Sequence, residues 1–241
     1  MVHFKFAMNK TIKLITTIMF VFVCAVAWAL PSTGVSNLQT TPGVTTNTSG
    51  SSLSIIAPNK SILVWQNFGG STDTIAFGDT VNYALPSANS SVLNIVSGNT
   101  RTTIDGTLTS NGNVYVLNPD GILVGGGARI DVNSLYLSTS DNAAFAGFYF
   151  QNNGKLQSQD SAVIANGTTT ITSGAIIAVT DNISLVSRNV DIGAVISQGN
   201  FNITGDGNVI VGSAGTTYVT GNVNITNPTG VTTLGAAGST F

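Results

Sequence analysis

The chain has 241 residues, of which 42% are hydrophobic and only 7% are charged, against about 25% charged residues in an average globular protein. It contains no Glu, its one His and one Cys are His3 and Cys24, and downstream of residue 29 five Lys and Arg face ten Asp, a net charge of −5. This composition excludes an intrachain disulfide and the basic patch by which a protein grips nucleic acid or an anionic membrane.

The first 29 residues have the pattern of a secretory signal peptide. Three lysines precede an uncharged, mostly apolar stretch from Leu14 to Trp28, and Ala27 and Ala29 frame an A-x-A cleavage pattern. An uncleaved membrane anchor is the alternative, but about 15 apolar residues fall short of the roughly 20 that span a bilayer. We therefore expect export by the general secretory machinery, with Met1 or Met8 as the start of translation.

After this segment, short β-prone runs alternate with turns, and no run has a helical period. Residues 30–52 are uncharged and weakly hydrophobic, so we expect an extended lead-in that forms the N-terminal cap, followed by the folded domain over residues 53–241. Gly, Asn, Asp and Pro separate the runs and favour turns, because they accept or fix the backbone angles that turns need. The expected strands are, in chain order, Ser61–Trp65, Thr74–Phe77, Thr80–Leu85, a short run at Ile104, Val114–Leu117, Ile122–Val124, Ala128–Val132, Leu135–Leu137, Ala162–Ala165, Thr169–Thr172, Ile183–Val186, Phe201–Thr204, Val209–Val211 and Val223–Thr226.

A repeat of about 20 residues predicts how these strands are arranged. Gly154, Gly174 and Gly193 each open the pattern Gly, any residue, aliphatic, any residue, small residue, and Gly106 opens an earlier copy. Short strands and turns at this period are typical of a stacked solenoid in which each repeat is one coil of a parallel β-helix. A sandwich of hairpins is the rival all-β arrangement, and the repeat argues against it. The gap between Gly106 and Gly154 exceeds two periods and predicts an extra-helical excursion, to which the aromatic stretch Asp141–Phe150 would belong.

Several motifs follow one another between residues 55 and 212 in the order of a known family. They are Trp65-Gln66-Asn67-Phe68 for W-x-x-F, Leu93–Gly98 for L-N-R-V-x-G, Thr103–Leu108 for S-x-I-x-G-x-L, Asn111–Ile122 for N-G-x-V-x-L-I-N-P-N-G-I and Leu135–Thr139 for L-V-A-S-T. In this order the chain resembles the N-terminal secretion domain of two-partner secretion exoproteins, also called the filamentous haemagglutinin or haemagglutination-activity domain. Ile95 replaces the usual Arg and Asp120 the second Asn of N-P-N-G; neither changes the expected fold, and both could alter partner selectivity.

The resemblance implies a right-handed parallel β-helix with a capped N-terminal end and extra-helical hairpins. It also implies a non-catalytic targeting role in an adhesin-like exoprotein of a Gram-negative bacterium, secreted or held at the cell surface. The periplasmic domains of a dedicated outer-membrane β-barrel transporter would recognise the unfolded or partly folded chain, which then folds outside and seeds further coils. Family members usually continue for hundreds of residues. The sequence therefore leaves open a fragment, a truncated gene or a short variant, and any binding to host-cell or surface glycans would need a downstream region.

The motif residues are the candidate site. Asn118, Pro119, Asp120 and Gly121 have the order of a type I turn, with Pro second and Gly fourth, and the family motif makes this turn a candidate contact with the transporter. Asn94 and Asn111 are expected to stack as an internal ladder. A purely structural role is expected for the aromatic pair and the repeated glycines: Trp65, Phe68, Gly106, Gly154, Gly174 and Gly193.

Parts of the sequence are compatible with three other functions. β-Helices also include polysaccharide lyases and hydrolases, but without His, Cys or Glu the acid/base work would fall to Asp105, Asp131 and Arg129, and nothing in their spacing makes them converge. Gly125–Asp131 resembles a calcium-binding repeat only loosely and occurs once, so neither a metal nor a cofactor is expected. A stand-alone solenoid that binds ice or glycans through Thr-rich pieces remains the third alternative.

Overall fold

The computed structural model describes residues 41–68, 73–140, 149, 153–154, 167–193, 196–197, 199–213 and 218–235. Within these residues lie the strands β1 to β22. The predicted signal peptide, with Ala27 and Ala29, and the strand expected at Ala162–Ala165 lie outside these residues. Within them no helix is long and apolar enough to cross a membrane.

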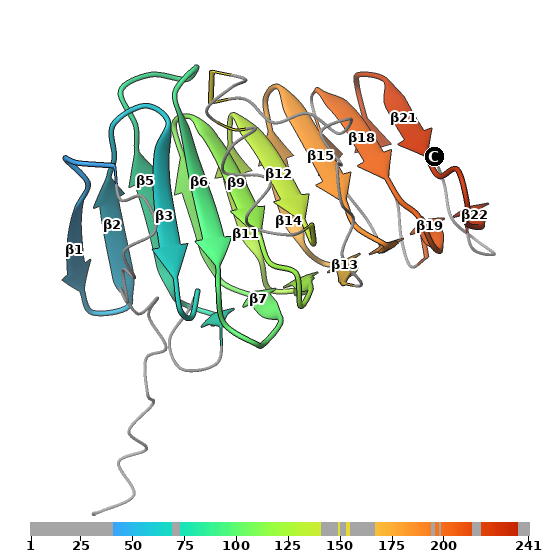
Figure 1. Cartoon of the computed structure of the whole chain (residues 1–241), viewed down its shortest axis with the longest axis horizontal. Helices are drawn as coiled ribbons and strands as arrows, with labels where there is room; N and C mark the ends of the chain where they lie inside the picture. Colours follow the sequence, from blue (N-terminus) through green and yellow to red (C-terminus); the bar gives the residue numbers. More distant parts are fainter. Residues whose placement is uncertain are drawn as a thin grey trace, which may run out of the picture.

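The strands stack into a parallel β-helix with three long sheets, seen side-on in Figure 1. The first sheet contains β1 (Thr45–Ser49), β2 (Ser52–Ile56), β5 (Thr80–Ala84), β8 (Thr107–Ser110), β11 (Arg129–Val132) and β14 (Ile176–Val179). The second contains β3 (Ser61–Trp65), β6 (Ser91–Val96), β9 (Asn113–Leu117), β12 (Ser134–Ser138), β15 (Asn182–Val186), β18 (Asn200–Thr204) and β21 (Val223–Thr226). The third contains β4 (Thr74–Ile75), β7 (Thr102–Ile104), β10 (Ile122–Val124), β13 (Thr168–Ile171), β16 (Asn189–Ile192), β19 (Val209–Val211) and β22 (Thr232–Leu234), and a separate parallel pair is formed by β17 (Ile196–Ser197) and β20 (Tyr218–Val219).

Each coil takes one strand from each sheet in turn, so that β5, β6 and β7 form one coil and β8, β9 and β10 form the next. Inward-facing aliphatic side chains stack directly above one another, because neighbouring parallel strands are in register. One column of the second sheet, with every member at most 1% exposed, consists of Val92, Val114, Leu135, Ile183 and Phe201. Their spacings of 22, 21, 48 and 18 residues confirm the coil period and place one long insertion.

The insertion is the connection from β12 to β13, residues 139–167. Six other connections from a second-sheet strand to a third-sheet strand have two to eight residues, whereas this one has 29. Gly154 lies within it, and so differs from the coil position expected from the repeat. The register places Gly127 beside Gly174, whereas Gly106 lies beside Ala128, so the glycines of the pattern do not share one position in the coil. The five-residue pattern is too short to separate a coil from a chance match.

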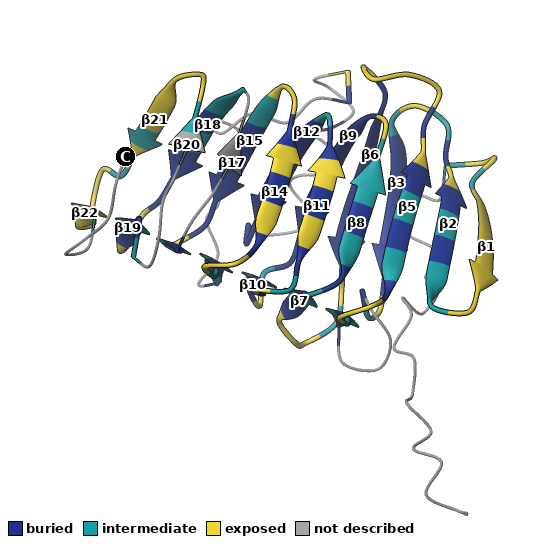
Figure 2. Cartoon of the chain, turned by 180° about the vertical axis from the view of Figure 1, so that it is seen from behind, coloured by how far each residue is buried: buried dark blue, intermediate teal, exposed yellow. Residues whose placement is uncertain are grey.

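Both ends of the β-helix differ from its middle. β1, which lies in the expected lead-in, is fully exposed and pairs antiparallel with β2, so it closes the N-terminal end of the first sheet. At the other end the inward column becomes exposed, since the described residues hold no further coil beside it: Val223 is 50% exposed where Phe201 is buried. Figure 2 shows this change along the stack, together with exposed positions on the outer faces of β11 and β14.

Candidate functional site

The motif residues meet around the side chain of Asn94, which points from β6 into the β-helix. Its carboxamide oxygen accepts hydrogen bonds from the indole N–H of Trp65, at 2.9 Å, and from the hydroxyl of Tyr83, at 2.7 Å. Its amide nitrogen donates to the backbone oxygen of Tyr115, at 3.1 Å. Asn94 is completely buried, and burial raises the pKa of the Tyr83 hydroxyl. Because β3, β5 and β9 each supply a partner to this side chain on β6, Asn94 ties the first three coils together.

Trp65 and Phe68 lie at the corner where β3 turns toward β4 in the first coil. Their rings meet edge to face, with centroids 5.3 Å apart, and Phe68 is fully buried. The Phe68 N–H donates to the carboxylate of Asp73, at 2.5 Å, and the Thr100 hydroxyl donates to the same carboxylate. Asp73 is buried and has a positive φ of 49°. The W-x-x-F motif is therefore held by a carboxylate that its own pattern does not include.

The turn from Asn118 to Gly121 joins β9 to β10. The Gly121 N–H donates to the Asn118 carbonyl, at 3.1 Å, and the Asp120 N–H donates to the Asn118 side-chain oxygen, at 2.9 Å. The Asn118 amide reaches back to the preceding coil, where it donates to the Thr100 carbonyl at 2.9 Å and the Thr102 hydroxyl at 2.8 Å. Asn118 is buried and Asp120 is exposed. Asp120, and in part Pro119, are thus the residues of this turn that a partner could contact.

Asn111 does not stack on Asn94. Its side chain makes two hydrogen bonds to the backbone of Leu85 in the preceding coil, accepting from the N–H at 2.8 Å and donating to the carbonyl at 2.7 Å. The asparagine ladders form at other positions, with side-chain bonds of 2.9 to 3.0 Å within the pairs Asn133 and Asn113, Asn200 and Asn182, and Asn224 and Asn202. Asn94 and Asn111 are thus two separate anchors, since one faces the interior and the other lies in a turn.

Gly106, Gly174 and Gly193 lie just before β8, β14 and the β17 strand, where the third sheet turns into the first. A Cβ atom on Gly106 would lie 2.3 Å from the carbonyl oxygen of Ala76 and 2.6 Å from that of Asp79. The preceding coil therefore comes too close to Gly106 for a side chain, whereas Ala128 and Ala175 lie beside it in the next two coils.

Asp79 lies at the same corner, and its carboxyl group is buried. Its side chain is 2% exposed and its Oδ2 atom has no hydrogen-bond partner. Burial raises the pKa of this carboxyl, and a hydrogen bond from the backbone of Ala76 partly opposes the rise. Because the pKa of this carboxyl is raised in the folded state, the group stabilises the fold at pH values below its ordinary pKa of about 3.9. This contribution is lost as the pH rises through the folded-state pKa.

We therefore expect Asp79→Asn to raise the free energy of unfolding at pH 7 by about 0.5 to 1 kcal/mol, because it removes an unpaired buried charge. The gain should shrink toward pH 4, as the wild-type carboxyl takes up its proton. Urea unfolding at both pH values measures it, with Asp131→Asn, on the exposed face of β11, as the matched loss of one charge. An equal gain from both substitutions at both pH values would contradict this account.

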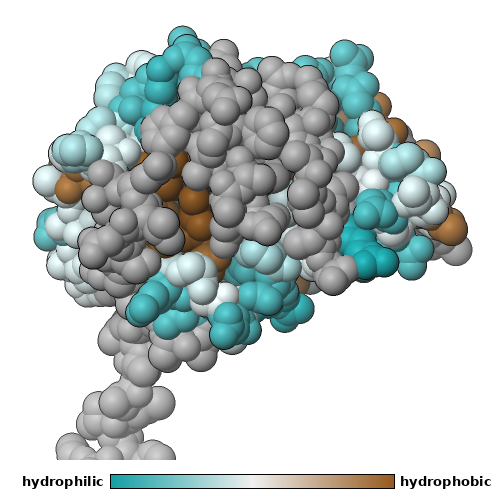
Figure 3. All heavy atoms as spheres, viewed as in Figure 1, coloured by the Kyte–Doolittle hydropathy of each residue, from teal (hydrophilic) through white to brown (hydrophobic). Residues whose placement is uncertain are grey.

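The outer face of the second sheet carries a feature that the strand predictions did not include. Its first four strands are buried on both faces, and the outward-facing side chains form a second apolar cluster. We call the following residues the outer strip: Ile62, Val64, Leu93, Ile95, Tyr115, Leu117 and Tyr136. Figure 3 shows part of this face as hydrophobic surface. The signal in the sequence was the unbroken apolar runs of these strands, which are typical of strands covered on both sides.

Tyr149, from the insertion, packs on the outer strip. Its ring lies edge to face with Tyr115, at a centroid distance of 5.8 Å, and its hydroxyl is 2.8 Å from the hydroxyl of Ser91. Tyr149 is fully buried, and burial raises the pKa of its hydroxyl. Nearby, the Lys60 ammonium donates to the side-chain oxygen of Asn153. Ile95, one of the two departures from the family pattern, lies in this strip, whereas Asp120 lies in the exposed turn.

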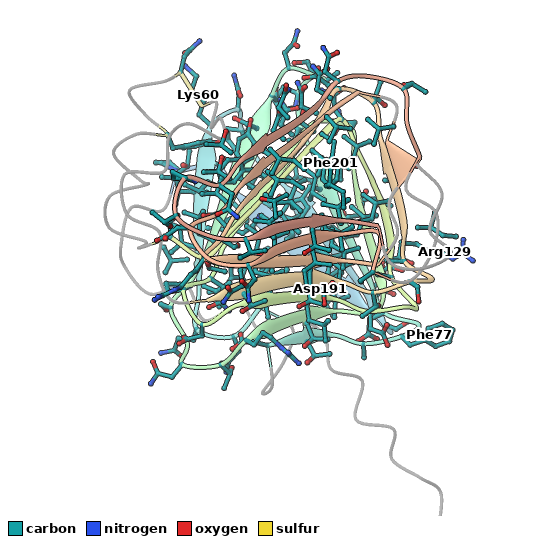
Figure 4. The ribbon with its side chains drawn as sticks, turned by 90° about the vertical axis from the view of Figure 1, so that its right-hand side faces the viewer. Lys60, Phe77, Arg129, Asp191 and Phe201 are labelled. Carbon is teal, nitrogen blue, oxygen red and sulfur yellow. The ribbon has the colours of Figure 1, made fainter. Side chains whose placement is uncertain are left out.

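The three residues that the sequence offers for catalysis lie at a corner of the coil and on the outer face of β11. Asp105 accepts a hydrogen bond from the Gly127 N–H, at 2.8 Å, at the corner before the first sheet. Arg129 and Asp131 are exposed on the outer face of β11, and Figure 4 shows Arg129 at the edge of the coil, pointing to solvent. In the part of the chain that the structure describes, no group of three His, Cys, Asp or Glu residues could hold a metal ion.

Comparison with known proteins assigns the family. The model of the TPS secretion domain matches residues 30–240. The heme/hemopexin-binding protein of Haemophilus influenzae strain Rd is 43% identical over 61 residues, which are 25% of this chain and 7% of that protein. A second Haemophilus influenzae heme/hemopexin-binding protein is 32% identical over 83 residues, 34% of this chain and 8% of that protein. The matched segments thus span less than a tenth of these relatives.

A solved structure has the same fold. The crystal structure of the HMW1 secretion domain from Haemophilus influenzae superposes with a TM-score of 0.51 at 19% identity, covering 75% of this chain and 64% of that one. The order of motifs, the stacked parallel coils and the family match over residues 30–240 agree. This chain belongs to the TPS secretion domain family, the secretion domains of two-partner secretion exoproteins.

Proposed function

We propose that this domain directs the export of its exoprotein across the outer membrane without performing catalysis. The periplasmic domains of a cognate outer-membrane β-barrel transporter bind the chain before it has finished folding, and folding is completed outside the cell. The observation that carries the proposal is the family match over residues 30–240. The exoprotein is then released from a Gram-negative cell or kept at its surface, and there it acts like an adhesin.

A second part of the proposal is the seeding of further coils. In-register stacking supports it, since Val223 lies beside Phe201 and Leu234 beside Val211 in the preceding coil. Each coil of such a stack can act as the template for the next. Since each coil contacts its neighbours, folding can proceed coil by coil and draw the chain outward.

Secretion with and without the transporter tests the proposal. We expect the chain in the culture medium only when its cognate transporter is present, and in the periplasm when that transporter is absent. N-terminal sequencing of the exported chain should begin at Leu30, directly after the Ala27–Ala29 cleavage pattern. Appearance in the medium without the transporter, or retention in the periplasm despite it, would overturn the targeting role.

A further inference from the structure

The outer face of the first sheet carries an exposed patch that the proposed function does not use. Over β2, β5 and β8 the outward side chains are half-buried Ser, Thr and Asn, with the exposed Ile56 and Ala84 at the strand ends. Over β11 and β14 the outward side chains are exposed, as Figure 2 shows. We call the following residues the exposed patch: Phe77, Arg129, Asp131, Ile176 and Ala178.

Large apolar side chains are exposed at this patch. Among the residues that the structure describes there are six exposed large hydrophobic residues, of which three lie in the coil of β21 and β22 and the others are Ile56, Phe77 and Ile176. Phe77 is 79% exposed and lies against Gly127, where a Cβ atom would be 2.8 Å from its ring. Figure 4 shows Phe77 and Arg129 extending from the same side of the coil. Apolar surface left in water on a rigid sheet favours a partner that covers it.

The patch also holds the only charged residues in the described strands of the first sheet, Arg129 and Asp131. They lie on the same face of β11, because they are two residues apart and side chains alternate along a strand. Among the described residues neither side chain has a hydrogen-bond or ion-pair partner. On the neighbouring strand Ile176 lies beside Arg129 and Ala178 beside Asp131. One cation and one anion therefore stand unpaired within a small apolar surface.

We infer that a second copy of this domain binds the exposed patch, so that two folded copies pair face to face through β11 and β14. A twofold axis between the two faces, running across the strands, sets β11 of one copy against β11 of the other in the reverse direction. Arg129 of each copy then faces Asp131 of the other, and Ile176 of each faces Ala178 of the other. A twofold axis along the strands would instead set Arg129 against Arg129, so the charges select the first arrangement.

This arrangement has consequences for the orientation and the strength of the pair. Both copies point the same way, because the twofold axis is parallel to the direction in which the coils are stacked. The contact is small, since it consists of the outward side chains of two short strands, and we expect a dissociation constant of about 0.1 to 1 mM. The domain would therefore pair where copies are concentrated and stay monomeric where they are dilute. The inference concerns the folded domain and does not rest on the proposed function.

Sedimentation equilibrium of the chain that begins after Ala29, at concentrations that bracket this dissociation constant, measures the pairing. Arg129→Asp and Asp131→Arg should each weaken it about tenfold or more, because symmetry sets like charges against each other twice. An equimolar mixture of these two variants should pair within about twofold of wild type, since opposite charges then meet at both positions. The double variant with both substitutions should pair equally well, for the same reason.

Three further measurements separate this contact from net charge and from folding. Arg101→Asp makes the same change of charge at an exposed residue outside the first sheet and should leave the dissociation constant within about twofold. Ile176→Ser should weaken pairing about tenfold, because Ile176 is 42% exposed and its surface is lost from both copies. Circular dichroism should remain that of a β-helix for every variant, since all of these side chains point outward.

Two results would overturn the inference. One is wild type that remains a monomer at every concentration. The other is a mixture of Arg129→Asp and Asp131→Arg that associates no better than either variant alone, which would place any contact between copies on another surface. Neither result bears on the proposed function, because export in the presence and absence of the transporter is measured separately.

Discussion

Replacing Asn94 by Leu should lower the free energy of unfolding by about 3 to 5 kcal/mol, because the substitution removes the acceptor of two buried hydrogen bonds. The donors are the Trp65 indole N–H and the Tyr83 hydroxyl. Neither of them can reach water, since Asn94 is completely buried between three coils. Urea unfolding followed by circular dichroism measures the change, with the midpoint compared at constant slope.

Two variants separate this network from a general loss of packing. Tyr83→Phe removes one donor and leaves the Asn94 oxygen bonded to Trp65, so it should cost only about 1 kcal/mol. Asn202→Leu makes the same side-chain change on the half-buried outer face and should stay within about 0.5 kcal/mol. If Asn94→Leu destabilised the domain no more than Asn202→Leu, the hydrogen bonds around Asn94 would not contribute to the stability of the domain.

Replacing Phe68 by Ala should destabilise the domain by about 3 to 5 kcal/mol, since it opens a cavity beside Trp65 in the first coil. Phe68 is fully buried and lies edge to face with Trp65, 5.3 Å between ring centroids. The chain's other tryptophan is Trp28, within the predicted signal peptide. In the chain that begins after Ala29, tryptophan fluorescence therefore reports on Trp65 alone, and Phe68→Ala should shift its emission to the red at a lower urea concentration.

The matched control is Phe77→Ala. Phe77 is 79% exposed at the next corner of the coil, where Figure 4 shows it extending from the stack, and its loss should cost less than about 0.5 kcal/mol. The two substitutions remove the same atoms at sites that differ in burial. Equal costs would mean that burial at this corner of the first coil is not what the W-x-x-F motif provides.

The β-helix itself could be predicted from local pattern. Runs of β-branched residues between Asn and Gly turns identify strands, and a spacing near 20 residues identifies coils, because both are properties of neighbouring residues in the chain. The run Ile122–Val124 coincides with β10, and the turn from Asn118 to Gly121 follows from the backbone preferences of Pro and Gly. The motif order then identified the family that the match over residues 30–240 confirms.

The partners of individual side chains could not be predicted in this way. Asn94 and Asn111 lie in matching motifs, yet one binds Trp65, Tyr83 and Tyr115 inside the coil and the other binds the backbone of Leu85. The direction in which each side chain points depends on the register between coils. In a strand with apolar residues on both faces, the sequence does not show which positions face inward and which face outward. Gly154 failed as a repeat mark for a related reason, since the five-residue pattern takes no account of which strands are paired.

The sequence by itself determined the coil, its period, the turns between strands and the family, because these depend on backbone preferences and on the order of short motifs. Only the tertiary structure decided which face of the second sheet carries the outer strip, which carboxylate holds Phe68, and where Tyr149 lies. These contacts join residues between five and 58 positions apart. They exist only once the coils are stacked, since stacking is what brings such residues within bonding distance and removes water from between them.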